Sequence, residues 1–291
     1  MKDINIFCFG FGQVAKNFIK KLIIEKYNIK LTTTSRNKSS KKNFNGIQYN
    51  SYLFNNDKFD NNLLAELKEA NHILISIPPE KQEDIVVKNF SKFIKQSKVK
   101  WVTYLSATSV YGDHKGEWVN EDSETKPTSS NGISRLNAEN SWLSLQRSVN
   151  LPFQIFRLSG IYSNEKNILV GLKLGTAKLI DKKGHYFSRI HVEDIANILL
   201  KSLSKFKSGE TYNLADDKPS SSEEITLYGA KLLNIKNLEK IKIYELQSEI
   251  LKNFYKDSKK VSNSKMKNFF NYKLKFATYV EGLNYINDNV I

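Results

Sequence analysis

The first residues whose spacing points to ligand chemistry are two glycines near the beginning of the chain. Residues 10–15 read G-F-G-Q-V-A, which is a G-x-G-x-x-A pattern. Gly10 permits a tight turn, Gly12 lets the backbone approach a pyrophosphate at a helix N-terminus, and the small Ala15 permits close helix–strand packing. A dinucleotide-binding turn is therefore expected, and a tight strand-to-helix turn without a ligand is the alternative. The predicted cofactor contacts of this segment are Gly10, Phe11, Gly12, Gln13 and Val14.

The residues that would meet the adenosine ribose come at the end of the next strand-like segment. A carboxylate at this place would accept hydrogen bonds from the 2′-hydroxyl of NAD. The chain instead reads T-S-R-N-K at 34–38, and no acidic residue follows until Asp57. The Arg36 guanidinium can form a forked contact with a 2′-phosphate while Ser35 donates its hydroxyl, so NADP is favoured over NAD. The alternative is that Arg36 is a surface residue of a mobile loop.

Alternating strands and helices must position these residues. Apolar runs predict strands at 4–9, 29–34, 72–77, 101–105 and 153–158, and helical spacing predicts helices at 12–25, 62–69, 83–96 and 137–147. A polar stretch rich in Lys, Asn and Ser extends to Asn45. The alternation is typical of an α/β fold with a Rossmann-type, doubly wound parallel sheet, whose ligands lie at the carboxyl ends of the strands. Ile77 and Pro78, at one such end, are also predicted cofactor contacts.

Two lobes are expected from the 291 residues, because the composition is that of a globular chain with 40% hydrophobic residues. Residues 1–164 are assigned to the dinucleotide-binding Rossmann domain, to which 186–215 return. Residues 165–185 and 216–291 are assigned to a smaller C-terminal substrate lobe. Further along the chain, a helix is expected at 191–204, a strand at 211–214 and a helix at 222–233. A lobe over the carboxyl edge of the sheet would close a ligand cleft.

The strongly basic composition raises the question of a polyanionic partner. The chain has 45 Lys and Arg against 30 Asp and Glu, a net charge of +15. Residues 1–100 carry 18 bases and 9 acids, residues 101–200 carry 11 and 10, and residues 201–291 carry 16 and 11. The excess is mostly dispersed Lys, and no basic stripe with stacking aromatics accompanies it. A solvated surface is therefore favoured over nucleic-acid binding, which is not expected as the main function.

Cysteine, histidine and hydropathy exclude several other classes. One cysteine, Cys8, cannot form a disulfide framework, and four scattered His make a metal site improbable. No run approaches 18 consecutive apolar residues, and the N-terminus enters a strand-like segment directly. No metal and no membrane partner are expected, and a cytoplasmic location is the default.

Five further strings follow the glycine turn in a fixed order. They read L-S-A-T-S-V-Y-G-D at 105–113, N-G-I-S-R-L-N-A-E at 131–139, R-L-S-G-I-Y at 157–162, R-I-H-V-E-D-I-A at 189–196 and Y-N-L at 212–214. With the glycine turn, they resemble the extended short-chain dehydrogenase/reductase superfamily, in its nucleotide-sugar epimerase and dehydratase branch. The resemblance covers essentially the whole chain, and it implies a Rossmann fold, an NAD(P) cofactor and hydride-transfer chemistry.

The chain departs from this superfamily at the residues that transfer the proton. The resemblance implies a Ser or Thr at position 107, a Tyr at 131 and a Lys at 135, whereas the chain has Ala107, Asn131 and Arg135. An Asn amide does not titrate, so Asn131 cannot act as the general acid or base. Arg135 keeps a positive charge that can bind a ribose or phosphate, so it stays among the predicted cofactor contacts. The chain is therefore an atypical member that lacks the Tyr-x-x-x-Lys pair.

Other residues near the expected cleft are candidates for catalysis or substrate binding. Ser106 and Thr108 flank the vacant position 107, and Tyr111 lies one turn beyond; Ser and Thr at a strand end also commonly satisfy backbone groups. His191 is the titratable candidate near the cleft, with a structural role as the alternative. The catalytic candidates are thus Thr108, Ser106, Tyr111 and His191, and Ser106 is also a predicted cofactor contact. The predicted substrate contacts are Arg157, Arg189 and His191.

Arg157 has two open interpretations, because it can bind substrate or pair with a carboxylate such as Glu139. The favoured function is an NADP-dependent, epimerase/dehydratase-like oxidoreductase that acts on a sugar-like or other hydroxylated small molecule, with non-standard proton handling. The alternative is a catalytically inactive NADP(H)-binding regulatory or sensor module. A homodimer through the helices at 83–96 and 137–147 is left open.

Overall fold

The computed structural model describes residues 2–80, 83–180, 182, 184–246, 252 and 255–290. The chain divides into two compact units: unit 1 comprises Met1–Ala107, Ile133–Arg157 and Ile195–Tyr212, and unit 2 comprises Thr108–Gly132, Leu158–Asp194 and Asn213–Ile291. This division differs from the predicted lobes, since residues 108–132, 158–164, 186–194 and 213–215 belong to the second unit. Within unit 2, the segment after residue 107 is bonded to a distant part of the chain, because the Ser258 N–H donates to Asp113 Oδ1 at 2.8 Å.

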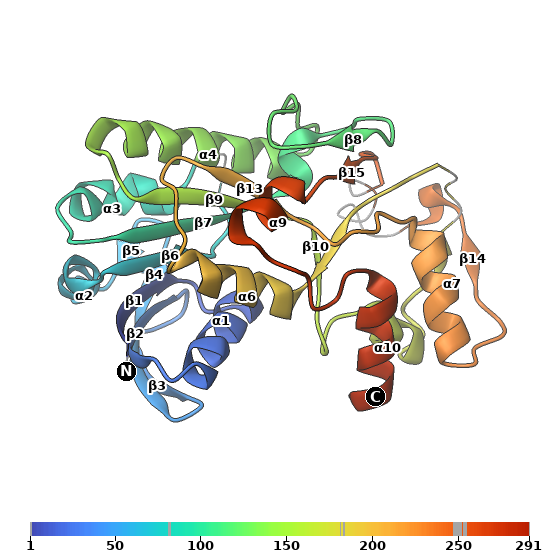
Figure 1. Ribbon diagram of the computed structural model, residues 1–291, viewed down its shortest axis with the longest axis horizontal. Coiled ribbons are helices and arrows are strands. Elements are labelled where there is room, and N and C mark those ends of the chain that lie inside the picture. The colour runs from blue at the N-terminus through green and yellow to red at the C-terminus, as the bar shows by residue number, and fades with distance from the viewer. Residues whose placement is uncertain are drawn as a thin grey trace. The chain divides into compact units, whose positions relative to one another are not determined.

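Unit 1 is organised by a nine-stranded sheet (Figure 1). Its strands are β1 (Asp3–Phe9), β2 (Asn28–Ser35), β3 (Ser40–Phe44), β4 (Ile47–Asn55), β5 (Lys58–Phe59), β6 (His72–Ile75), β7 (Trp101–Ala107), β9 (Phe153–Leu158) and β13 (Thr211–Leu214). Their order is β13-β9-β7-β6-β1-β2-β4-β3, and β5 pairs with β4. The pairs β1–β2, β1–β6, β6–β7 and β2–β4 are parallel. The predicted α/β fold with a mostly parallel sheet is confirmed.

Helices cover both faces of this sheet (Figure 1). They are α1 (Gln13–Ile24), α2 (Leu63–Glu69), α3 (Ile85–Lys95), α4 (Ser130–Val149) and α6 (Val192–Ser202). Alternate β1 residues Phe7 and Phe9 share one buried cluster with Leu67 of α2, Phe90 of α3 and Trp142 of α4. This packing fixes the carboxyl ends of the strands, where the predicted cofactor contacts lie.

The polar stretch before Asn45 contains a structure that was not assigned from the sequence. Strands β3 and β4 pair in antiparallel fashion around the dipeptide Asn45-Gly46, whose φ angles are +50° and +87°. Two positive φ values in a two-residue loop match the hairpin turn that Asn-Gly favours. The mostly exposed side chains of β3 gave no alternation of apolar residues, which is why the strand was missed.

Helix α4 begins earlier than predicted, at Ser130 instead of Asn137. Its first turn contains Gly132, where a Cβ atom would lie 2.7 Å from the Ser109 carbonyl oxygen and 2.8 Å from Pro127 Cβ. Close packing within unit 2 therefore selects a glycine that helix propensity alone disfavours. Asn131 and Arg135 are consequently helical residues one turn apart.

Unit 2 is built from short elements. These are η1 (Thr108–Tyr111), β8 (Trp118–Val119), β10 (Gly160–Tyr162), α5 (Ile168–Lys173), β11 (Leu179–Ile180), β12 (Arg189–His191), α7 (Ser222–Leu232), β14 (Lys240–Ile241), η2 (Ile243–Glu245), β15 (Lys260–Val261), α9 (Ser264–Phe270) and α10 (Tyr279–Asn289). Strands β10 and β12 pair in parallel. A buried cluster joins β10, α5, α7 and α10 through Tyr162, Leu169, Ile225, Tyr279, Leu283 and Ile286.

Helix α10 packs so closely on β10 that one position accepts only glycine. A Cβ atom at Gly282 would overlap the Tyr162 ring and its hydroxyl. Gly282→Ala is therefore expected to lower the free energy of unfolding by about 1–3 kcal/mol, because overpacking outweighs the gain of about 1 kcal/mol in helix propensity. Urea unfolding followed by circular dichroism measures the change.

Gly229→Ala in α7 is the matched control. Its Cβ would approach the Leu172 Cδ1 methyl to 2.9 Å, and that flexible tip can move. The Gly229 variant is expected to lose less stability than the Gly282 variant. If Gly282→Ala were as stable as the unmodified chain, the close approach of α10 to Tyr162 would be contradicted.

Candidate functional site

The glycine turn in unit 1 has the geometry that its sequence predicts. Gly10 follows β1 with a φ of +84°, and its N–H donates to Thr34 Oγ1 at 2.9 Å. A Cβ atom at Gly10 would lie 2.6 Å from Ile77 Cγ2. Gly12 precedes α1, no side chain caps this helix, and a Cβ at Gly12 would have nothing within 4 Å. The backbone at Gly12 is therefore open to the close approach of a pyrophosphate, a group that helix N-termini favour.

The other residues of the turn are fixed by packing. The Phe11 ring contacts Phe44 and Tyr49 of the β3–β4 hairpin, with centroid distances of 5.2 and 5.3 Å. Val14 is buried, and the Gln13 carbonyl accepts a hydrogen bond from Asn17 Nδ2 at 2.8 Å. The β3–β4 hairpin, which was not predicted from the sequence, thus packs against the glycine turn that was predicted to contact the cofactor.

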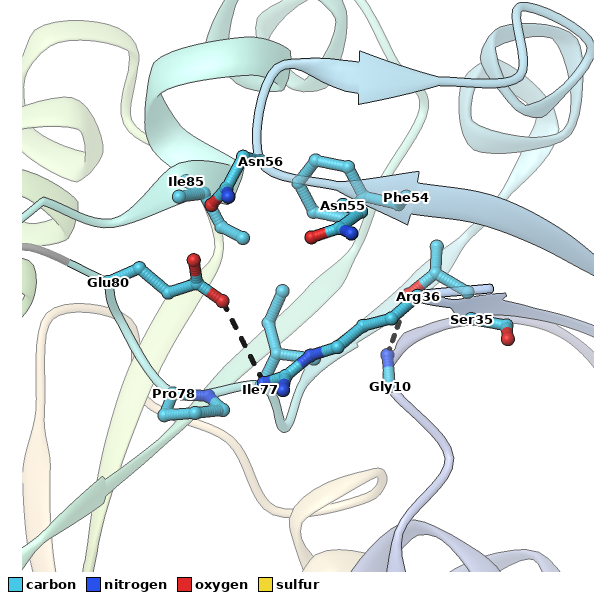
Figure 2. A pocket seen from close by; sticks show the side chains of 11 residues that line it. Gly10, Ser35, Arg36, Phe54, Asn55, Asn56, Ile77, Pro78, Glu80 and Ile85 are labelled. Carbon is cyan, nitrogen blue, oxygen red and sulfur yellow. Dashed lines mark hydrogen bonds and ion pairs between the residues drawn. The ribbon is translucent and has the colours of Figure 1, made fainter. Parts of the chain in front are cut away.

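A pocket of about 150 Å³ lies beside the turn (Figure 2). It is formed at the ends of β1, β2, β4 and β6, and Gly10, Ser35, Arg36, Ile77 and Pro78 from the predicted set all line it. The remaining lining residues are Thr34, Phe54, Asn55, Asn56, Glu80 and Ile85. The structure therefore brings together five residues that the sequence assigned to the cofactor.

Two opposite charges meet in this pocket. Arg36 Nη2 lies 3.8 Å from Glu80 Oε1, and the Arg36 side chain is 64% exposed. Figure 2 shows the guanidinium reaching across the pocket toward Glu80, with Asn55 on the opposite wall. An exposed pair at this distance is weak, so the Arg36 side chain can turn toward another anion at little cost. Glu80 was missed from the sequence, although its position just after the Pro78-Pro79 strand stop could have indicated it.

A buried polar cluster lies within unit 1 at the carboxyl end of β7. Ser106 Oγ donates to Glu139 Oε1 at 2.5 Å, and Arg157 Nη2 donates to Glu139 Oε2 at 2.7 Å. All three residues are buried, and Glu139 is only 1% exposed. Of the two interpretations of Arg157, the pairing with Glu139 is the one present. This ion pair engages the guanidinium that was predicted to contact substrate, and the Ser106 hydroxyl is bound to the same carboxylate.

The residues at the superfamily's Tyr and Lys positions lie on one helix face. Asn131, Arg135 and Glu139 are spaced by four residues along α4, which aligns their side chains. Asn131 is exposed and Arg135 is half-buried. The Arg135 Nη1 donates to the Leu105 carbonyl at 2.5 Å, so the guanidinium is held at the end of β7.

The candidates after β7 lie in η1 of unit 2. Tyr111 is buried, and its hydroxyl donates to Asn213 Oδ1 at 2.8 Å. The Tyr111 hydroxyl is therefore engaged within unit 2, and a catalytic role for Tyr111 stays a prediction. Thr108 begins η1 and is half-buried. A catalytic role for Thr108 stays a prediction.

Two further candidates lie on β12 of unit 2. His191 is buried, its ring contacts Tyr162 and Phe276 at centroid distances of 4.9 and 4.3 Å, and burial lowers its pKa to about 4. Its Nδ1 accepts the Glu193 N–H at 3.2 Å. The imidazole is therefore neutral near pH 7 and packed; its catalytic role stays a prediction. Arg189 is also buried, and its Nη1 donates to Ser220 Oγ at 2.7 Å.

One acidic residue beside Arg189 was missed from the sequence. Asp216 follows β13, its N–H donates to the Arg189 carbonyl at 2.6 Å, and the residue is 2% exposed. Burial raises its pKa to about 8, with Arg189 opposing the shift. The adjacent acids at 216 and 217 read as an ordinary surface turn, so no pattern in the sequence indicated a buried carboxyl.

Two further findings concern the residues that the structure describes. In that part of the chain, no group of three or more His, Cys, Asp or Glu is arranged to hold a metal ion. No described helix combines the length and apolar character needed to cross a bilayer.

Comparison with solved structures places the fold. The chain is 29% identical to a conserved protein of unknown function from Silicibacter pomeroyi, with a TM-score of 0.85 and 99% of each chain covered. It also matches dTDP-glucose 4,6-dehydratase from Bacillus anthracis in complex with NAD, at 19% identity and a TM-score of 0.77, covering 99% of this chain and 96% of that one. UDP-glucuronic acid 4-epimerase from Bacillus cereus in complex with NAD matches at 15% identity and a TM-score of 0.75, with 99% of each chain covered.

Comparison by sequence finds a family model that matches part of the chain. No curated protein matches the chain. Residues 85–215 match the model of the NAD dependent epimerase/dehydratase family, and this range contains all five strings that follow the glycine turn. The glycine turn precedes the matched range and has the required geometry. Residues 85–215 therefore resemble the NAD dependent epimerase/dehydratase family, and the chain has the fold of the solved dehydratase and epimerase.

Proposed function

We propose that this protein is an NAD(P)-dependent oxidoreductase of the epimerase/dehydratase type. The observation that carries the proposal is the pocket at the glycine turn, which is lined by Gly10, Ser35, Arg36, Ile77 and Pro78. The open space before α1 would hold the pyrophosphate, and the pocket would receive the adenosine ribose. A bound nicotinamide would supply hydride transfer to or from a hydroxylated, sugar-like small molecule. Relatives in this fold are named for action on nucleotide sugars, which supports that substrate class.

We further propose NADP over NAD, on the basis of Arg36. Its guanidinium lies in the pocket, and Ser35 beside it offers a hydroxyl. A 2′-phosphate would replace the weak contact of Arg36 with Glu80 by a stronger, forked one. The solved dehydratase and epimerase named above are complexes with NAD, so the proposed preference rests on the residues at 35 and 36 of this chain.

Arg36→Gln is expected to weaken NADPH binding by about tenfold or more and to leave NADH binding nearly unchanged, because a charge-assisted hydrogen bond contributes about 1.5–3 kcal/mol. Fluorescence titration of both reduced cofactors measures the two affinities. Lys38→Gln is the matched control, since it removes an exposed positive charge from the same loop but not from the pocket. Equal losses for NADPH and NADH in Arg36→Gln would contradict the proposed preference.

The proton must be handled without the Tyr-x-x-x-Lys pair. Asn131 has no titratable proton, and Arg135 donates to the Leu105 carbonyl while keeping its charge. We propose that Arg135 binds the cofactor and that Thr108, His191 or water completes the proton transfer. The test is a substrate-dependent change in NADPH absorbance across nucleotide sugars, ketones and aldehydes. No change with any of them, with the cofactor bound, would contradict turnover.

The second candidate function is a catalytically inactive NADP(H)-binding regulatory module. It is favoured by Asn131 and by Ala107, which together remove the hydroxyls that the superfamily uses. A module that reports the redox state must bind NADPH and NADP⁺ with different affinities, since a ligand shifts an equilibrium only by its differential binding. Equal affinities for the two forms would contradict this alternative.

A further inference from the structure

Unit 2 has a cavity of its own, with a volume of about 310 Å³. Its lining comes from β10, α5, β12, α7 and α10, together with Phe187 just before β12. The apolar part of the wall is formed by Ile161, Ile168, Phe187, Ile225 and Leu283. Arg189 is the only charged side chain among the described residues that line it. Apolar walls with one fixed charge are the features of a small-molecule site.

Arg189 is held in a defined position. Its Nη1 donates to Ser220 Oγ at 2.7 Å and to the Ser220 carbonyl at 3.3 Å. Its Cζ lies 3.5 Å from the centroid of the Phe187 ring, and the residue is 6% exposed. In the part of the chain that the structure describes, the hydrogen bonds of its guanidinium all use Nη1. The Nε and Nη2 edge is therefore available to a ligand, in an orientation that the stacking fixes in advance.

The positive charge of Arg189 is not neutralised by a neighbouring carboxylate. Among the described residues, no acidic side chain lies within ion-pair distance of it. Asp216 is the acid with the largest electrostatic effect on the pKa of Arg189, and the burial of Asp216 favours its neutral carboxyl form. Glu224 is engaged elsewhere, because it pairs with Lys218 at 2.9 Å and accepts the Tyr279 hydroxyl at 2.8 Å. A buried cation without a partner is costly, so an anion entering the cavity would be strongly favoured.

We propose that the unit 2 cavity binds a small monocarboxylate, whose carboxylate is held by the free edge of the Arg189 guanidinium and whose apolar body lies against Phe187 and Ile225. A planar carboxylate matches the fork of a guanidinium. The inference goes beyond the proposed function, since it uses unit 2 residues only and requires no cofactor.

The charge of the cavity favours a monoanion over a nucleotide diphosphate. A diphosphate needs at least two positive groups to balance it, whereas the described lining offers Arg189 alone. The ligand of this cavity is therefore expected to differ from the nucleotide sugars after which the solved relatives are named.

Monocarboxylate binding should depend on pH through Asp216. The pKa of this carboxyl is raised to about 8, and the groups that act on it besides the backbone are Arg189 and Asp217. Asp216 also acts on the buried Tyr162 hydroxyl, and Arg189 is further influenced by Tyr255, Tyr279 and Glu224. Above this pKa, the Asp216 carboxylate would neutralise Arg189 and repel the ligand. Affinity is therefore expected to fall as the pH rises past about 8.

The first experiment uses the unmodified, cofactor-free chain and compares benzoate, its neutral isostere benzamide, phenyl phosphate and UDP by isothermal titration calorimetry. Benzoate is expected to bind saturably, and benzamide about tenfold or more weakly, because the charge-assisted bonds to Arg189 are lost. Phenyl phosphate, which carries a higher charge, and UDP are also expected to bind more weakly than benzoate. Equal binding of benzoate and benzamide, absence of benzoate binding, or tighter binding of UDP would each overturn the proposal.

The second experiment uses variants. Arg189→Gln is expected to abolish benzoate binding, and its NADPH affinity reports whether unit 1 remains folded. Asp216→Asn is expected to bind benzoate as the unmodified chain does at about pH 7 and to lose the decline above about pH 8, because an amide does not ionise. If the affinity of Asp216→Asn for benzoate still fell above about pH 8, the proposed role of Asp216 would be contradicted. The calorimetry contains no NADP(H). A failure to bind benzoate would therefore overturn the monocarboxylate site alone, and the proposed oxidoreductase function would still be decided by the NADPH absorbance test.

Discussion

Glu139→Gln is expected to lower the free energy of unfolding by about 3–5 kcal/mol, because it leaves the buried Arg157 guanidinium without its anion. The carboxylate accepts bonds from Arg157 Nε at 3.1 and 3.2 Å and from Nη2 at 2.7 Å, and also from Ser106 Oγ. Its side chain is 1% exposed and that of Arg157 is 9% exposed, so water cannot replace the lost partner. Urea unfolding measured by fluorescence gives the change in free energy.

Two further variants separate charge pairing from simple packing. Lys30→Gln removes one partner of the Lys30–Glu66 pair, whose side chains are 56% and 21% exposed, and it is expected to cost less than about 1 kcal/mol. The double variant Glu139→Met with Arg157→Met is expected to recover most of the stability lost in Glu139→Gln, because it removes both buried charges. A double variant as unstable as the single one would mean that packing, and not the ion pair, stabilises this part of unit 1.

The sequence predicted those features of unit 1 that depend on local patterns. The apolar run at 4–9 and the glycines at 10 and 12 required nothing beyond neighbouring residues, and both appear at the expected place. The pairing of Arg157 with Glu139 was one of two interpretations, and spacing alone could not choose between them. The choice depends on burial at both positions, which is a property of the folded chain.

Features that depend on contacts distant in the sequence were not predicted. The strand at 40–44 has mostly exposed side chains, and its identity comes from pairing with β4 around an Asn-Gly turn. The early start of α4 depends on the contact of Gly132 with Ser109 and Pro127, which overrides low helix propensity. Similarly, Asp216 is buried because the backbone bond to Arg189 holds it there, and residues 27 positions apart give no periodic signal.

Burial of Asp216 has a large expected effect on stability as well as on ligand binding. The folded-state pKa is about 8, whereas an unfolded Asp titrates at about 3.9. At a pH between these two pKa values, Asp216 is protonated in the folded chain and ionised in the unfolded chain, so the folded chain binds one proton more. Stability from this group is therefore fully present below about pH 3.9 and is lost as the pH rises toward about 8.

Asp216→Asn removes this dependence. The difference in unfolding free energy between the variant and the unmodified chain is expected to grow in favour of the variant by about 1.4 kcal/mol per pH unit between about pH 5 and about pH 7. Asn keeps the acceptor that Oδ1 offers to the Lys218 N–H, so the fold is retained. Urea unfolding of both proteins at several pH values measures the two profiles.

Asp216→Ala tests whether ionisation alone sets the slope. It loses the Lys218 contact and leaves a small cavity, so its stability should lie below that of Asp216→Asn by a constant amount at every pH. Its pH profile should nevertheless run parallel to that of Asp216→Asn, because neither side chain titrates. If the pH profiles of the unmodified chain and Asp216→Asn ran parallel, the buried carboxyl would be ionised in the folded state. The charge balance proposed around Arg189 would then be contradicted, because it requires a neutral Asp216.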